Sequence, residues 1–121
     1  MKKILIVDDQ ADIRRLISLT LGGQYDLLEA GDGATAMAMV ETGRPDAVIL
    51  DVMMPGDLDG FDVLAKIKGD PATRSICVVM LTAKGQASDI DSAIGKGADA
   101  YLVKPFSPLQ LTRVLQEHIG S

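Results

Sequence analysis

The chain alternates short apolar runs with longer stretches in which apolar residues recur at helical spacing. The runs are rich in β-branched residues, which is typical of strands buried on both faces of a parallel sheet. They predict strands at residues 3–8, 25–30, 46–51, 76–82 and 99–103. The amphipathic stretches predict helices at residues 10–22, 33–42, 60–68, 87–96 and 107–118.

Strands that alternate with helices over short connections indicate an α/β fold whose helices cover both faces of a parallel sheet. Right-handed crossovers limit the strand orders that such a chain can adopt. We therefore expect one domain, residues 1–121, with a flavodoxin-like, doubly wound, five-stranded sheet in the order 2-1-3-4-5 and five helices.

Polar residues stand where four of the predicted strands end. Asp8 ends the first strand and Asp9 follows it, Asp51 ends the third, Thr82 ends the fourth, and Lys104 follows the fifth. In the order 2-1-3-4-5 the first and third strands are neighbours, and ligands bind beyond the carboxyl ends of such strands. The sequence therefore predicts that these five side chains share one site.

Three carboxylates held together need a cation. At about 4 Å and an effective dielectric constant near 20, each like-charged pair costs about 4 kcal/mol. Ligation by oxygen alone favours Mg²⁺, or Mn²⁺, over zinc. Beside such an ion, Asp51 can attack phosphorus and form an acyl phosphate, whose oxygens Thr82 and Lys104 would contact.

Composition excludes several other classes of protein. With 12 Lys and Arg against 17 Asp and Glu, a net charge of −5 argues against nucleic-acid binding. No apolar run approaches the roughly 18 residues of a membrane span, and Asp8 interrupts the first run too early for a signal peptide. We therefore expect a cytoplasmic protein without a membrane partner. The single cysteine, Cys77, excludes an intramolecular disulfide and is expected to be a buried thiol.

Five motifs, in order along nearly the whole chain, carry a resemblance to a known family. They are Ile6-Val7-Asp8-Asp9, Asp51-Val52-Met53-Met54-Pro55, Asp59-Gly60, Met80-Leu81-Thr82-Ala83 and Gly97-Ala98-Asp99-Ala100-Tyr101-Leu102-Val103-Lys104-Pro105-Phe106. Each motif alone is weak, but together they resemble the receiver domains of two-component response regulators, in particular single-domain chemotaxis regulators.

The resemblance implies that Asp51 is the phosphoacceptor and that Thr82 and Lys104 contact the phosphoryl group. It implies a cis peptide bond between Lys104 and Pro105, a bond type that tolerates this form. The implied Mg²⁺ ligands are Asp9, Asp51, the main-chain carbonyl of Met53 and, through water, Asp8.

The resemblance also implies a switch and a set of partners. On phosphorylation, Thr82 moves toward the phosphoryl group and Tyr101 turns inward, which reshapes the face built from residues 87–96, 99–103 and 107–118. The phosphodonor would be a histidine kinase or a histidine phosphotransfer protein, and the output would be contact with a downstream protein. The chain would be a monomer or a weak dimer through that face. It would hydrolyse its acyl phosphate slowly without being a conventional enzyme.

Three positions depart from the family pattern. The loop before Asp59-Gly60 has one residue more than usual, within Gly56-Asp57-Leu58, and we expect Asp57 to face solvent rather than the metal. Ala100 replaces an acidic residue typical of transcription-factor subgroups, which puts their dimer mode in doubt. His118 is expected to be a surface residue.

Three other functions fit the same residues less well. A phosphorylation-independent interaction module of this fold is the main alternative, although it would not need the complete set of site residues. A haloacid-dehalogenase-like phosphatase needs a second acid where Met53 stands. A flavodoxin is disfavoured because the carboxylates of residues 8–12 would repel its phosphate.

Overall fold

The computed structural model describes residues 1–83 and 95–120. Its strands are β1 (Lys3–Val7), β2 (Asp26–Ala30), β3 (Ala47–Asp51), β4 (Cys77–Ala83) and β5 (Ala100–Lys104). Its helices are α1 (Ala11–Leu21), α2 (Gly33–Gly43), α3 (Gly60–Gly69) and α5 (Pro108–His118). The bounds predicted for these elements agree with the structure to within one residue at each end. The predicted helix at residues 87–96 lies almost entirely outside the described residues, which contain four helices rather than five.

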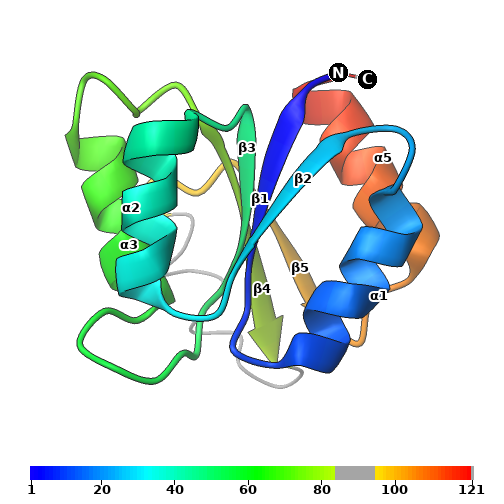
Figure 1. Cartoon of the computed structure of the whole chain (residues 1–121), viewed down its shortest axis with the longest axis horizontal. Helices are drawn as coiled ribbons and strands as arrows, with labels where there is room; N and C mark the ends of the chain where they lie inside the picture. Colours follow the sequence, from blue (N-terminus) through cyan, green and yellow to red (C-terminus); the bar gives the residue numbers. More distant parts are fainter. Residues whose placement is uncertain (84–94, 121) are drawn as a thin grey trace.

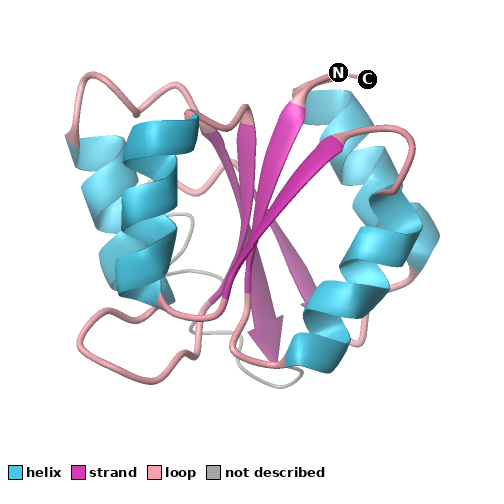
Figure 2. Ribbon diagram, viewed as in Figure 1, coloured by secondary structure: helices cyan, strands magenta, loops and turns pink. Residues whose placement is uncertain are grey.

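The five strands form one parallel sheet in the order β2-β1-β3-β4-β5, so the predicted doubly wound α/β fold is confirmed. Helices α2 and α3 cover one face of the sheet, and α1 and α5 cover the other (Figures 1 and 2). Among the helices of the described ranges, none is long and apolar enough to cross a membrane.

Alternate residues of each central strand enter two separate hydrophobic cores, because successive side chains in a strand point to opposite faces. Leu5, Val48 and Leu50 pack toward α2 and α3. Ile4 and Ile49 pack toward α1 and α5. All five side chains are fully buried, which explains why their strands are apolar without interruption.

The register of the sheet brings the polar strand ends together. Val7 pairs with Leu50 across β1 and β3, so Asp8 and Asp51 are the next residues along two neighbouring strands. Asp51 in turn pairs with Leu81 of β4. The carboxyl ends of β1, β3 and β4 therefore meet at one edge.

Two predictions away from this edge are confirmed. Cys77 is buried, and its burial raises the pKa of the thiol to about 11, so the thiol stays protonated at neutral pH. His118 is exposed near the end of α5, where its ring nitrogens lie 2.9 Å from the carbonyl oxygen of Val114 and 3.1 Å from that of Asp99.

Candidate functional site

Three carboxylates meet at the carboxyl edge of the sheet. One oxygen each from Asp8, Asp9 and Asp51 lies within 4.8 Å of the other two. Asp8 is fully buried and Asp51 is 7% exposed, whereas Asp9 is exposed to solvent. Over the described part of the chain, no other group of three acidic, histidine or cysteine side chains is arranged to hold a metal ion. Burial of two acids beside a third suits a hard divalent cation that enters from the exposed side.

Lys104 joins two of these acids. Its Nζ donates to Asp8 Oδ2 at 2.9 Å and lies 3.4 Å from Asp51 Oδ2. Burial by itself would lower the pKa of Lys104, but the hydrogen bond that Lys104 donates to Asp8 and the charge of Asp51 outweigh this effect and raise the pKa. The ammonium therefore stays charged and fixed between the two carboxylates.

The surroundings of Asp51 disfavour its ionised form. Desolvation and the negative charge of Asp8 raise the pKa of Asp51 to about 6, against the lowering effects of Lys104 and the Met53 N–H. The Met53 N–H lies 3.4 Å from Asp51 Oδ1, which makes this a weak contact. One lysine is thus too little positive charge for the cluster, and a cation would supply the rest.

Asp8 is held by contacts that the sequence reasoning missed. Its Oδ1 accepts the main-chain N–H of Gln10 at 2.9 Å, and its carbonyl oxygen accepts Arg14 Nη1 at 2.6 Å. Arg14 also donates to Glu29 on β2 at 3.1 Å. An aspartate commonly accepts the N–H two residues ahead, so the Gln10 contact could have been foreseen. The Arg14 contact could not, because it depends on how α1 packs on the sheet.

Thr82 is a buried hydroxyl at the end of β4. It is fully buried, and its Oγ1 has no hydrogen-bond partner among the described residues. A buried hydroxyl without a hydrogen-bond partner costs about 1–3 kcal/mol of folding free energy. Such groups are therefore rare and often have a functional role. Thr82 follows Leu81, which pairs with Asp51, and an unpaired donor at this end of the sheet fits a site that receives a group rich in acceptor oxygens.

An open pocket of about 350 Å³ gives access to these groups. Its lining includes Asp9, Asp51, Met53, Ala83 and Lys104. The small side chain of Ala83 leaves the approach to Asp51 open, and Met53 stands at the rim with 65% of its surface exposed. The pocket therefore combines acidic, cationic and apolar walls around one carboxylate.

Two further predicted residues lie on or next to β5. Tyr101 is 41% exposed, so its ring is on the surface and not packed behind Thr82. The peptide bond between Lys104 and Pro105 is cis. The inward movement predicted for Tyr101 remains a prediction.

The loop after β3 carries Asp57, the acid in the segment that is one residue longer than usual. Asp57 is exposed and is not part of the acidic cluster. It lines a separate pocket at the start of α2, next to Asp32 and Gly33. Asp57 is therefore exposed and separate from the acidic cluster, as expected.

Gly60 lets α3 begin directly against the end of β3. The Gly60 N–H donates to the carbonyl oxygen of Val52 at 3.0 Å. A Cβ at this position would collide with the carbonyl oxygen of Asp51 and would lie 2.7 Å from Val52 Cα. Both obstacles are main-chain atoms, so only glycine fits beside the acidic cluster.

We expect Gly60→Ala to destabilise the protein by about 1–3 kcal/mol, because the new methyl group must displace the main chain of β3. Urea denaturation measures this change. The matched control is Gly69→Ala at the other end of α3, where a Cβ meets nothing within 4 Å. An equal loss of stability in both variants would contradict the close approach of Gly60 to Asp51.

Comparison with known proteins agrees with this geometry. Residues 4–116 match the protein family described as the response regulator receiver domain. Over 116 residues the chain is 40% identical to the phosphate regulon transcriptional regulatory protein PhoB of Pseudomonas aeruginosa, a match that covers 95% of this chain and 50% of PhoB. The chain spans about half the length, or less, of the curated relatives that it matches.

Solved structures show the same similarity over the whole domain. The chemotaxis protein CheY4 of Vibrio cholerae is 33% identical with a TM-score of 0.89, and the match covers 98% of this chain and 99% of CheY4. The receiver domain of NtrX from Brucella abortus is 32% identical with a TM-score of 0.90, and the match covers 98% of each chain.

A receiver domain is a signalling module of two-component systems and not a conventional enzyme. The sequence match, the strand order and the acidic pocket all lead to the same assignment. The chain therefore belongs to the family of response regulator receiver domains.

Proposed function

We propose that this receiver domain accepts a phosphoryl group on Asp51 in a Mg²⁺-dependent reaction. The observation that carries the proposal is the position of the Asp51 carboxylate. It lies in an open pocket, beside two further acids and 3.4 Å from the Lys104 ammonium. No other described carboxylate combines burial, access and a cationic neighbour in this way.

The donor set suits Mg²⁺ because it offers oxygen ligands only. Asp9 and Asp51 would hold the ion directly, the main-chain carbonyl of Met53 would add a third protein ligand, and Asp8 would bind through water. When bound, the ion supplies positive charge that neutralises the carboxylates and the oxygens of the transferred group.

In the proposed reaction, an Asp51 carboxylate oxygen forms a bond to phosphorus while the bond from phosphorus to the donor nitrogen breaks. The donor is a phosphohistidine of a histidine kinase or of a histidine phosphotransfer protein. Lys104 is already charged and fixed by Asp8, so it can pair with the transferred oxygens without reorganising. Water then hydrolyses the acyl phosphate slowly, which releases inorganic phosphate and restores the Asp51 carboxylate.

Thr82 and Tyr101 form the proposed switch. The unpaired Thr82 Oγ1 gains a phosphoryl oxygen as an acceptor, and its movement leaves space behind it. Tyr101, now 41% exposed, turns inward and changes the surface of β5 and α5. A downstream protein that binds the changed surface would read the signal. The part of this face at residues 84–94 lies outside the described residues.

Incubation with acetyl phosphate and Mg²⁺ tests the proposal. We expect intact-mass analysis to show one added phosphoryl group, which alkaline hydroxylamine removes because it is an acyl phosphate. Chelation of the metal with EDTA should abolish the adduct. A native protein that stays unmodified with Mg²⁺, or that is modified equally with EDTA, contradicts the proposal.

A further inference from the structure

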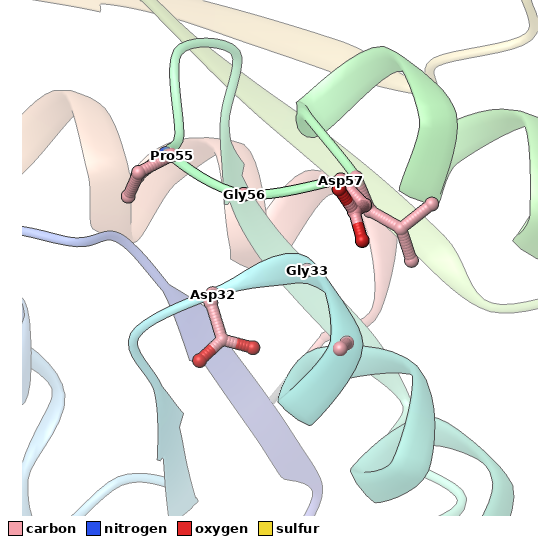
Figure 3. Close-up of a pocket in the computed structure, with 7 residues that line it drawn as sticks. Asp32, Gly33, Pro55, Gly56 and Asp57 are labelled. Carbon is pink, nitrogen blue, oxygen red and sulfur yellow. The ribbon is translucent and has the colours of Figure 1, made fainter.

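A second pocket lies between the first turn of α2 and the loop that leads from β3 to α3 (Figure 3). Its volume is about 440 Å³. Ala34, Pro55 and Leu58 give it apolar walls, and Asp32 and Asp57 add carboxylates. It shares no lining residue with the pocket around Asp51, so it needs its own explanation.

Close packing fixes the walls of this pocket. Gly33 is buried, and a Cβ there would lie 2.6 Å from both the Cβ and the carbonyl oxygen of Leu58. The loop therefore rests directly on the helix, as Figure 3 shows for the path from Pro55 to Asp57. At its far end the loop enters the capping box formed by Asp59 and Asp62. The pocket is preformed and does not depend on a ligand for its shape.

The start of α2 would attract an anion if its N–H groups were free, but two of them are already bonded to Asp32. The Asp32 carboxylate accepts the Thr35 N–H at 2.7 Å, and the Asp32 carbonyl oxygen accepts the Ala36 N–H at 3.0 Å. The hydrogen bonds from Thr35 hold the pKa of Asp32 below its usual range, so this carboxylate is ionised. Asp57 places a second carboxylate in the same pocket.

None of the residues that line this pocket is a lysine or an arginine. Arg44 is the only lysine or arginine between Arg15 and Lys66 in the sequence. It stands at the opposite end of α2, where its side chain donates to the carbonyl oxygen of Ala72. The charge of the pocket is therefore negative and has no basic partner among the lining residues.

A side chain with an apolar stem and a cationic head complements this pocket. Arginine meets both demands, because its methylene groups pack on apolar walls while its planar head can bind two carboxylates at once. We propose that the pocket between α2 and the loop after β3 is a docking site for an arginine side chain of a protein partner. The pocket shares no lining residue with the pocket around Asp51, so a partner docked here would leave the Asp51 pocket unoccupied. The proposal does not depend on phosphorylation.

Titration of the ¹⁵N-labelled full chain with N-acetyl-arginine methylamide tests this proposal by NMR. The matched neutral probe is the citrulline analogue, which has nearly the same shape without the charge. We expect saturable shifts of the Gly33, Ala34, Gly56 and Leu58 amides with the arginine probe only. Asp57→Asn should weaken this binding about threefold, as expected for one exposed charge pair. Glu41→Gln, which removes the same charge from the exposed face of the same helix, should leave it unchanged.

Four outcomes overturn the proposal. The first is an equal response to the citrulline probe, and the second is unchanged binding in Asp57→Asn. The third is a response centred on Asp9 and Lys104, which would make the other pocket the site of the interaction. If Mg²⁺ alone shifts the same amides and loses this effect in Asp57→Asn, the pocket binds metal ions and the proposal is also wrong. The unperturbed amides of each variant confirm that it is folded.

Discussion

Asp51→Asn is expected to abolish the phosphoryl adduct completely, because an amide oxygen is too weak a nucleophile to attack phosphorus. The substitution keeps the size and shape of the side chain, so Lys104 still has Asp8 as its partner at 2.9 Å. Intact-mass analysis after incubation with acetyl phosphate and Mg²⁺ measures the effect. The loss should be all or none, whereas a change at a residue that only positions Asp51 would slow the reaction.

Asp26→Asn is the matched control for this experiment. Asp26 is an exposed aspartate at the start of β2, at the opposite end of the strands from the acidic cluster. The control variant should form the adduct as the native protein does. An adduct that persists in Asp51→Asn would place the phosphoacceptor elsewhere and would contradict the proposed function at its central residue.

The strand-end residues could be predicted because two simple patterns coincide. Buried strands are continuous apolar runs in the sequence, and the first polar residue after such a run marks the carboxyl end of the strand. Once β1 and β3 are neighbours, Asp8 and Asp51 must be neighbours as well. The acidic cluster could thus be predicted from the strand order alone. No knowledge of contacts between side chains was needed.

The contacts that surround the cluster could not be predicted in the same way. Arg14 reaches the main chain of Asp8, and Lys68 binds an Asp99 carboxylate that is 31 residues away in the sequence. Both long side chains have several partners within reach, and only the packing of the helices decides among them. The pocket beside Gly33 is a similar case, because it exists only where Leu58 rests on α2.

The unpaired hydroxyl of Thr82 also lay beyond sequence reasoning. A threonine at a strand end commonly bonds to a turn or caps a helix, and the sequence is compatible with both. The structure instead leaves Oγ1 buried and without a partner among the described residues. The role that we propose for this hydroxyl toward a phosphoryl group is therefore argued from its burial and from its position at the end of β4.

In the absence of metal, the protein is expected to lose stability as the pH rises through about 6. The carboxyl group of Asp51 has a pKa of about 6 in the folded state and an ordinary value of 3.8. The folded state therefore binds more protons than the unfolded state between these values, and stability falls with rising pH. Each pKa unit corresponds to about 1.4 kcal/mol, so the whole transition amounts to about 3 kcal/mol. About 1.4 kcal/mol of it falls between about pH 5 and pH 8.

Urea denaturation in EDTA at these two pH values measures the loss, and Mg²⁺ should reverse it. The ion binds the ionised cluster in the folded state only, so its stabilising effect should be larger at the higher pH. Asp51→Asn provides the control, because a variant without this carboxyl group should show neither the loss nor its reversal. Asp32 does not affect this comparison. Its pKa is lowered in the folded state, so its contribution to stability changes with pH only below about its ordinary value of 3.8. Equal stability of the metal-free protein at both pH values would mean that burial and Asp8 do not raise the pKa of Asp51. The electrostatic argument for a metal ion at this site would then fail.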